Sequence, residues 1–166
     1  MFKNIKEVKK YIKENEIEFV DFKLIDLRGR FRHLTIPASN LNEETMKNGI
    51  GFDASNYGYA KVEKSDMVFY PDLATATLDP FSSSKTLTML ADVYVIKDKN
   101  IPFEQYPRNV VNAAIDYMKS TKIADEMIIG PEYEFTVIDS MNYKVAPNEV
   151  SYKLSSAESV WSSNDE

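Results

Sequence analysis

The amino-acid sequence predicts an α+β protein in which one complete small domain is followed by the beginning of a second. Two observations support this fold class. A helical pattern at the N-terminus is followed by several short runs with strand-like alternation, as far as about residue 97. A new helical pattern then starts near residue 107 and leads into a long alternating run. With 166 residues, the chain has room for one domain of ordinary size and part of another.

A change in periodicity predicts the first elements. Residues 3–15 place apolar side chains at helical spacing with lysines between them, which is typical of an amphipathic helix. Residues 18–26 alternate instead, and a second run at 31–37 follows a short turn, so we expect a β-hairpin. Because Pro37 ends the second strand, the polar residues after it lead into a short helix at 43–48.

The middle of the chain combines a loop with the strongest strand signal. Residues 49–66 contain three of the five glycines and little periodicity, which predicts a long loop that displays polar groups. Strand-like runs at 67–72 and 74–81 precede the run at 87–96, in which every second side chain is apolar.

The second domain is expected to begin after a linker at 98–108. The apolar stripe of the helix that starts at Pro107 should face a core, and residues 126–139 are predicted to form a strand. The polar tail at 141–166 shows no helix or strand that could close a core around that strand. We therefore expect the chain to stop inside a domain.

Composition restricts the possible chemistry. The chain has 26 acidic and 20 basic residues, a net charge of −6 and no basic stripe with interleaved aromatic residues, so nucleic acid is not expected as a partner. It has no cysteine and a single histidine, His33, so a metal would have to be bound by oxygen ligands. No apolar run approaches the roughly 20 residues of a membrane span, and no signal-peptide pattern begins the chain. No membrane is expected, and the cytoplasm is the expected location.

Two glutamates in the last predicted strand are the candidate metal ligands. Because side chains alternate along a strand, Glu132 and Glu134 project from one face, behind the constrained turn at Gly130 and Pro131. Neighbouring carboxylates repel each other unless a cation lies between them, and Mg²⁺ and Mn²⁺ prefer oxygen ligands of this kind. A solvated strand face would show the same pattern.

Asp53 is the candidate catalytic residue. It lies in a glycine-flanked loop beside Ser55 and Asn56, where its carboxylate could bind a cation or accept a proton. An Asx turn, in which nearby backbone N–H groups satisfy the carboxylate, is the competing interpretation.

Two basic residues also need an interpretation. His33 is expected on the surface of an edge strand. Arg108 follows Pro107 at a helix start, where the helix dipole disfavours a cation, so a partner carboxylate or phosphate is worth seeking. A solvated surface arginine is the competing interpretation. Asp72, next to a proline, is expected to serve a turn at a strand end.

Separated segments, taken in order, resemble glutamine synthetase of the bacterial type I class. Residues 21–38, DFKLIDLRGRFRHLTIPA, are similar to the first hairpin of that family. Residues 49–81 are similar to its F-D-G-S-S loop and to the S-D-M and P-D-x-x-T-A-x-x-D-P-F runs that follow. Residues 107–139 resemble the helix and the G-P-E-x-E-F strand that open its catalytic domain. The end near 160–162 resembles the segment that leads into a W-N stretch.

This resemblance implies a β-grasp N-terminal domain at residues 1–100 and the start of an α/β catalytic domain at 101–166. The family transfers the γ-phosphoryl group of ATP to glutamate, and ammonia then attacks the γ-glutamyl phosphate. The resemblance implies two Mg²⁺ or Mn²⁺ ions per site, one bound by Glu134 and the other by Glu132. It also implies that Asp53 helps to deprotonate ammonium in the site of a neighbouring subunit, within a self-associated ring, a dodecamer.

The chain departs from the family pattern at 52–56, where F-D-A-S-N replaces F-D-G-S-S. One glycine gains a Cβ atom and one hydroxyl becomes an amide. In the family, the remaining metal ligands and the segments that bind ATP and glutamate lie beyond the position of residue 166, so this chain alone is expected to be inactive. Two other functions stay open: a short non-catalytic homologue that caps a full-length synthetase, and a ligase of the same family that uses another amine.

Overall fold

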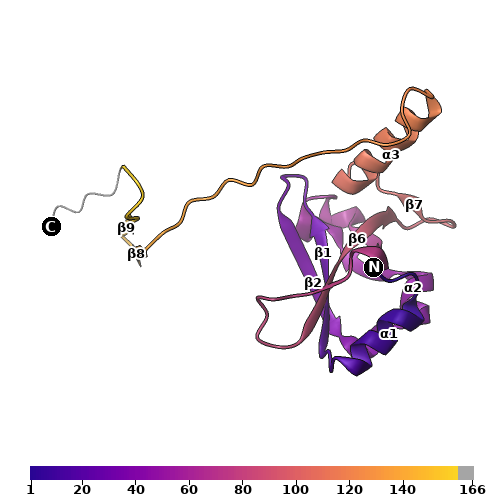
Figure 1. The fold of residues 1–166 in the computed structure, drawn as a ribbon, viewed down its shortest axis with the longest axis horizontal. Coiled ribbons are helices and arrows are strands. Elements are labelled where there is room, and N and C mark those ends of the chain that lie inside the picture. Colours follow the sequence, from indigo (N-terminus) through magenta and orange to yellow (C-terminus); the bar gives the residue numbers. More distant parts are fainter. Residues whose placement is uncertain (161–166) are drawn as a thin grey trace. The chain divides into compact units, whose positions relative to one another are not determined.

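The computed structural model describes residues 1–160, so Trp161 and Ser162 of the predicted W-N resemblance lie outside the described residues. The chain divides into two units, Met1–Met127 and Ile128–Glu166, and each is described by itself. The helices and strands, labelled in Figure 1, are α1 (Ile5–Glu14), β1 (Phe19–Ile25), β2 (Phe31–Pro37), α2 (Glu43–Asn48), β3 (Ile50–Asp53), β4 (Asp66–Pro71), β5 (Thr77–Leu78), β6 (Thr86–Val95), β7 (Ile101–Pro102), α3 (Pro107–Ser120), β8 (Ser140–Ala146) and β9 (Glu149–Ser155).

The first unit is built on a mixed sheet with strand order β2-β1-β6-β4-β3, and the short strands β5 and β7 also pair with β6. Strands β1 and β6 are parallel, with Phe22 opposite Met89, and the other pairs are antiparallel. A sheet of this kind with few helices confirms the predicted α+β class. Among residues 1–160, no helix has the length and apolar character needed to cross a membrane.

The core lies on the sheet face that carries the alternate apolar residues of β1 and β6. Phe22 is completely buried and its ring lies 5.3 Å from that of Phe69 on β4. Val8 of α1 packs into the same cluster. Burial of a side chain of this size contributes about 1.5–3 kcal/mol to the stability of the fold. The alternation at 87–96 correctly predicted which face of β6 is buried. The β1 and β6 residues of this face are Val20, Phe22, Leu24, Leu87, Met89, Ala91 and Val93.

Local hydrogen bonds position the first helix. The Asn4 side chain accepts a hydrogen bond from the Glu7 backbone N–H, and the Glu7 carboxylate accepts one from the Lys3 N–H, so two backbone N–H groups at the start of the helix are satisfied. The predicted helix at 3–15, the hairpin at 18–37 and the short helix at 43–48 are confirmed within one or two residues.

Two predictions in the middle of this unit were wrong in part. The expected loop at 49–66 contains β3, which pairs with β4 and so becomes the last strand of the sheet. The expected strand at 74–81 is reduced to Thr77–Leu78, because Leu73–Thr75 form a 3₁₀ turn capped by the Asp72 carboxylate. Alternation of apolar and polar residues reveals neither the pairing of β3 with β4, which is a tertiary contact, nor the cap that Asp72 provides, which is a feature of the turn.

The segment at 98–108, predicted as a linker, is part of the first unit instead. It contains β7, which pairs with β6, and Tyr106 is completely buried. The helix after it, α3, starts at Pro107 as predicted, but its apolar stripe is not in a core: Val110 and Val111 are each 52% exposed. An amphipathic pattern specifies an apolar face and not the element that covers it. The predicted domain boundary near residue 100 stays a prediction.

The C-terminal segment corrects one further prediction. Residues 126–139 form no strand, and the segment after Ile128 is extended and exposed, with Tyr133 and Phe135 each 85% exposed (Figure 1). A β-strand needs a neighbour to bond its backbone groups, and no described strand pairs with this segment. The tail at 141–166, where no helix or strand able to close a core was expected, contains an antiparallel hairpin, in which β8 pairs with β9 and Tyr143 lies opposite Tyr152. Most residues of this hairpin are exposed, so it closes no core.

Candidate functional site

Asp53 ends strand β3 and caps the 3₁₀ turn that follows, η2 (Ala54–Tyr57). One oxygen of its exposed carboxylate accepts hydrogen bonds from the Ser55 backbone N–H at 2.9 Å and from the Ser55 hydroxyl at 2.6 Å. These hydrogen bonds, to which the Ser65 side chain adds, lower the pKa of Asp53 below its ordinary value. The carboxylate therefore forms the Asx turn that was the competing interpretation. It is also exposed, and it is charged at neutral pH.

The loop accepts the alanine that replaces the family glycine. Ala54 is completely buried and belongs to the apolar core, and its backbone lies outside the left-handed region that would require glycine. The methyl group thus anchors the turn below Asp53 and costs no backbone strain.

Two tyrosines attach this loop to the β1–β2 hairpin. The Tyr57 hydroxyl donates to the His33 carbonyl at 3.3 Å, and the Tyr59 hydroxyl donates to the Ile25 carbonyl at 2.7 Å. Tyr59 is almost completely buried, and burial raises its pKa far above the ordinary range, so it remains a neutral donor. Asp53 is consequently carried by a loop that is tied to the sheet.

A pocket of about 330 Å³ lies between this loop and the hairpin turn. It is polar, because Asn56, the residue that replaces the second family serine, lines it together with Asp26 and Arg32. Asp26 and Arg32 are themselves paired at 3.0 Å. The full lining is Asp26, Leu27, Arg28, Arg32, Asn56, Tyr57 and Gly58.

Glu132 and Glu134 lie in the second unit, and both side chains are exposed. Within residues 1–160, no three His, Asp or Glu side chains gather as metal ligands would. The two carboxylates are the hard oxygen donors that Mg²⁺ and Mn²⁺ prefer, so they fit these ions chemically. They supply two of about six ligand positions, and their role as ligands stays a prediction.

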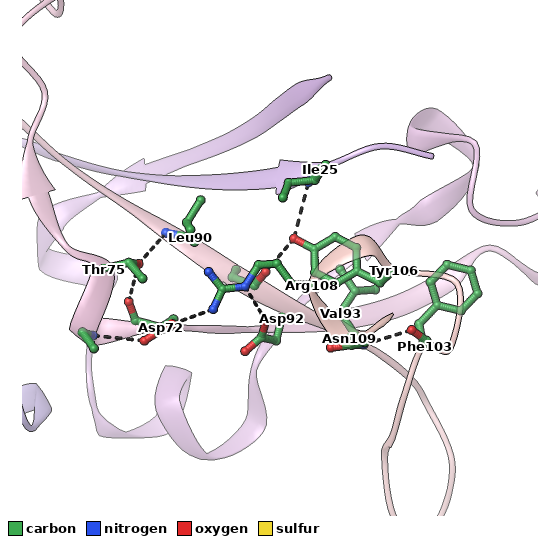
Figure 2. Close-up of polar contacts among 12 residues, drawn as sticks. Ile25, Asp72, Thr75, Leu90, Asp92, Val93, Phe103, Tyr106, Arg108 and Asn109 are labelled. Atoms are coloured by element: carbon green, nitrogen blue, oxygen red, sulfur yellow. Dashed lines mark hydrogen bonds and ion pairs between the residues drawn. The ribbon is translucent and has the colours of Figure 1, made fainter. Parts of the chain in front are cut away.

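Arg108 has a structural role that the sequence left open between a charged partner and a solvated surface. Its guanidinium group bonds two carboxylates at once: Nε lies 2.8 Å from Asp92 on β6, and a terminal nitrogen lies 2.6 Å from Asp72 (Figure 2). The position of Arg108 at a helix start suggested a partner carboxylate, and the structure provides two, Asp72 and Asp92. Hydrogen bonds and attraction from both carboxylates raise the pKa of Arg108, against the effect of burial. The turn role predicted for Asp72 is confirmed, since it also accepts from the Ala74 N–H.

Tyr106 and Asn109 complete this junction. The Tyr106 hydroxyl donates to the Ala91 carbonyl at 2.7 Å, and Asn109 donates to the carbonyls of Val93 and Phe103, both at 2.9 Å (Figure 2). Burial raises the pKa of Tyr106 to about 12, so it stays protonated. The network lies at the start of α3 and contains no exposed nucleophile or base. It fastens α3 to the sheet and has no catalytic chemistry of its own.

His33 behaves as predicted for an edge strand, because its side chain is 69% exposed on β2. Its Nδ1 atom lies 2.8 Å from the Asp21 carboxylate, which also accepts from the Thr35 hydroxyl at 2.6 Å. Asp21 is nearly buried, and these two contacts satisfy it. We assign this pair a structural role.

The chain is similar to proteins of one family. Residues 16–96 match the family model described as "Glutamine synthetase, beta-Grasp domain". The glutamine synthetase of Helicobacter pylori is 38% identical over 158 residues, which are 95% of this chain and 33% of that protein. A protein of Cupriavidus pinatubonensis named 3-hydroxylaminophenol mutase is 35% identical over 167 residues, which cover 100% of this chain and 35% of that protein.

A solved structure agrees in fold. The structure of Plasmodium falciparum glutamine synthetase superimposes with a TM-score of 0.69 at 21% sequence identity, over 92% of this chain and 30% of that one. The chain spans about a third of the length of the curated relatives that it matches. Together with the mixed sheet, the family match shows that this chain carries the β-grasp domain of the glutamine synthetase family and corresponds to the N-terminal region of its relatives.

Proposed function

We propose that this chain is the N-terminal part of an enzyme that uses ATP to ligate ammonia to glutamate through γ-glutamyl phosphate. The observation that carries the proposal is the geometry of Asp53: an exposed carboxylate, kept charged by its hydrogen bonds, on a loop that two tyrosines tie to the family's β-grasp domain. Such a group suits a reaction whose nitrogen donor arrives as a small cation.

In the proposed reaction Asp53 has two consecutive roles. Its negative charge attracts ammonium, and its lowered pKa keeps that charge in place at neutral pH. The nitrogen must lose a proton before it can attack the acyl phosphate, and the Asp53 carboxylate is the acceptor. The nitrogen then bonds to the carbonyl carbon of the γ-glutamyl group, the bond from that carbon to the phosphate oxygen breaks, and phosphate leaves with a proton from the nitrogen.

The glutamate pair completes the part of the proposed site that this chain carries. Glu132 and Glu134 would each hold one Mg²⁺ or Mn²⁺ ion together with ligands from elsewhere in the full-length protein. When bound, such ions neutralise charge that develops during phosphoryl transfer. We further propose, from the family resemblance, that Asp53 serves the site of a neighbouring subunit in a ring, that the ring is a dodecamer, and that the 166-residue chain alone is inactive.

The test uses the full-length gene product, assayed with glutamate, ATP, Mg²⁺ or Mn²⁺, and ammonium. We expect glutamine from the full-length enzyme, none from the 166-residue chain, and a fall in kcat of about 100-fold or more for Asp53→Asn, the range in which a lost proton acceptor acts. No glutamine from the unaltered full-length enzyme would refute the proposal.

The metal ligands are tested by Mn²⁺ affinity in the same enzyme. We expect Glu134→Gln to weaken Mn²⁺ binding by well over about tenfold, because a ligand charge is lost. Glu126→Gln removes an exposed carboxylate outside the pair and is the matched control. If the two variants bound Mn²⁺ with equal affinity, Glu132 and Glu134 would be solvated surface residues and not metal ligands.

A ligase of the same family with another amine acceptor is a second candidate. The specific observation in its favour is that Asn56, an amide in place of the family hydroxyl, lines the pocket beside the Asp53 loop. The name of the Cupriavidus relative also shows that similar chains occur in proteins named for other activities. Supplying the full-length enzyme with polyamines in place of ammonium separates the two candidates, since a faster reaction with a polyamine would favour the second.

A further inference from the structure

A second pocket, of about 550 Å³, lies away from every residue assigned above. It is formed where the end of α2, the strands β4 and β6 and the turn between β6 and β7 meet. The lining residues are Lys47, Asn48, Tyr70, Tyr94, Lys97, Asp98, Lys99 and Asn100.

The pocket concentrates positive charge in an acidic protein. Lys47, Lys97 and Lys99 line it although the chain carries a net charge of −6. None of the three forms an ion pair with another residue in the described part of the chain, whereas Lys23 and Lys85 do. Like charges that gather without partners repel each other, so an anion placed among them would be attracted. Asp98 is the one acidic residue of the lining.

Two aromatic rings form the wall of the pocket. Tyr70 and Tyr94 pack edge to face, with centroids 5.1 Å apart. The Asn100 amide donates to the Tyr70 hydroxyl at 2.9 Å, and its oxygen accepts from the Lys97 N–H at 3.2 Å. The turn that carries two of the lysines is therefore fastened to an aromatic wall. The Tyr70 hydroxyl, which accepts from Asn100, keeps its own proton to donate.

Close packing of the backbone positions the two residues of α2 that line the pocket. Gly49 follows α2 with a φ of +73°, and a Cβ atom there would lie 2.4 Å from Val68 and 3.2 Å from the Tyr70 ring. The absence of a side chain lets the end of α2 approach β4 closely, which brings Lys47 and Asn48 next to the tyrosines. The pocket thus depends on specific backbone geometry.

We propose that this pocket binds a nucleoside phosphate. The lysines attract the phosphate groups, and a tyrosine ring offers a face for a flat base, a contact worth about 1–3 kcal/mol in other proteins. Asp98 would repel a simple anion, but it accepts hydrogen bonds from ribose hydroxyls or from an amino group of a base. A ligand with charge at one end and hydrogen-bond donors at the other satisfies all three features. The proposal is independent of the ligase activity.

The test is calorimetric titration of the 166-residue chain with ADP, inorganic phosphate and adenosine in separate arms. We expect ADP to bind more tightly than either of the others, with an affinity that falls as salt is added. Lys97→Ala and Lys99→Ala should each weaken ADP binding by about tenfold, the effect of one lost charge-assisted contact. Tyr94→Leu should weaken ADP binding and leave phosphate binding unchanged.

The controls are Lys61→Ala and Lys64→Ala, which remove exposed lysines outside the pocket. Unchanged ADP affinity in these controls supports the pocket, while a loss equal to that of Lys97→Ala would show diffuse attraction and overturn the proposal. No ADP binding would overturn it, as would equal affinity for ADP and phosphate. Circular dichroism of each variant confirms that the fold is kept. Because the titration requires no turnover, its result is separate from that of the glutamine assay.

Discussion

At the residue scale, Arg108 joins segments that are far apart in the sequence. It bonds Asp72, which is 36 positions away, and Asp92, which is 16 positions away, and all three side chains are about three-quarters buried. The planar guanidinium suits this task because its nitrogens point in fixed, different directions. Without it, two carboxylates would face each other at the edge of the core.

We expect Arg108→Ala to lower the free energy of unfolding by about 1–3 kcal/mol, between the values for exposed and fully buried ion pairs. Arg108→Lys should recover only part of the loss, because one ammonium group replaces a fork. Urea denaturation measures both. Arg30→Ala removes an exposed arginine and should change the free energy by less than about 0.5 kcal/mol. Equal losses for Arg108→Ala and Arg30→Ala would contradict the structural role of the junction.

Asp26 should make stability depend on acid pH. The backbone N–H of Arg30 is the main cause that lowers the pKa of Asp26 below its ordinary value of 3.8, and the N–H of Arg28 and the Arg32 side chain add to it, against desolvation. A carboxyl whose pKa is lower when folded contributes its stability above the unfolded pKa. That contribution disappears as the pH falls through the folded pKa.

We therefore expect Asp26→Asn to be less stable than the unaltered chain at pH 6, and the difference to shrink below about pH 4, where the native carboxyl takes up its proton. Urea midpoints measured from pH 2 to pH 6 test this. Asp98→Asn, a change at an exposed position on the β6–β7 turn, is the control. A difference that stays constant over this pH range would argue against Asp26 as the titrating group.

At the scale of elements, the joint between α2 and β3 depends on Gly49. A Cβ atom at this position would meet Val68 at 2.4 Å and the Phe69 carbonyl oxygen at 2.8 Å, and the φ of +73° disfavours any residue with a side chain. We expect Gly49→Ala to destabilise the chain by about 2–4 kcal/mol, from the backbone conformation and from overpacking together.

Gly51 is the matched control, because a Cβ atom there meets nothing within 4 Å and its φ is not positive. Gly51→Ala should change stability by less than about 1 kcal/mol, in either direction. Thermal unfolding of both variants gives the comparison. Similar melting temperatures would show that the contacts at Gly49 relax at little cost.

At the scale of the whole molecule, the first unit contains the packed core, whereas residues 128–160, the described part of the second unit, contain none. Residues 128–138 form no hydrogen bond with any other described residue, whereas β6 is bonded on both sides by other strands. We expect backbone amides at 128–138 to exchange with deuterium close to the rate of an unfolded chain, and those of β1 and β6 to be strongly protected.

Hydrogen-exchange mass spectrometry of the 166-residue chain checks this directly. In the full-length protein, the proposed function requires the segment to join a sheet, so its amides should become protected there. Protection at 128–138 in the short chain would mean that the segment pairs without the rest of the protein.

Much of the first unit could be predicted because its signals are local. Alternation at 87–96 identified the buried face of β6, and helical spacing at 3–15 identified α1. Asp53 was singled out as a candidate because it lies in a glycine-flanked polar loop, and its carboxylate is exposed there, while its catalytic role stays a prediction. The Tyr106 anchor was missed, since a single tyrosine in a polar segment resembles any linker residue.

Periodicity, turn residues and charge are properties of neighbours along the chain, so they were enough to predict the fold class, the first helix, the β1–β2 hairpin and strand β6, and to single out the candidate residues. Which partner each face meets is not encoded locally. The exposed stripe of α3, the unpaired segment at 128–138 and the two carboxylates around Arg108 all depend on residues distant in the sequence. Strand pairing and side-chain burial are contacts between such distant residues, and for that reason folding in three dimensions settled them.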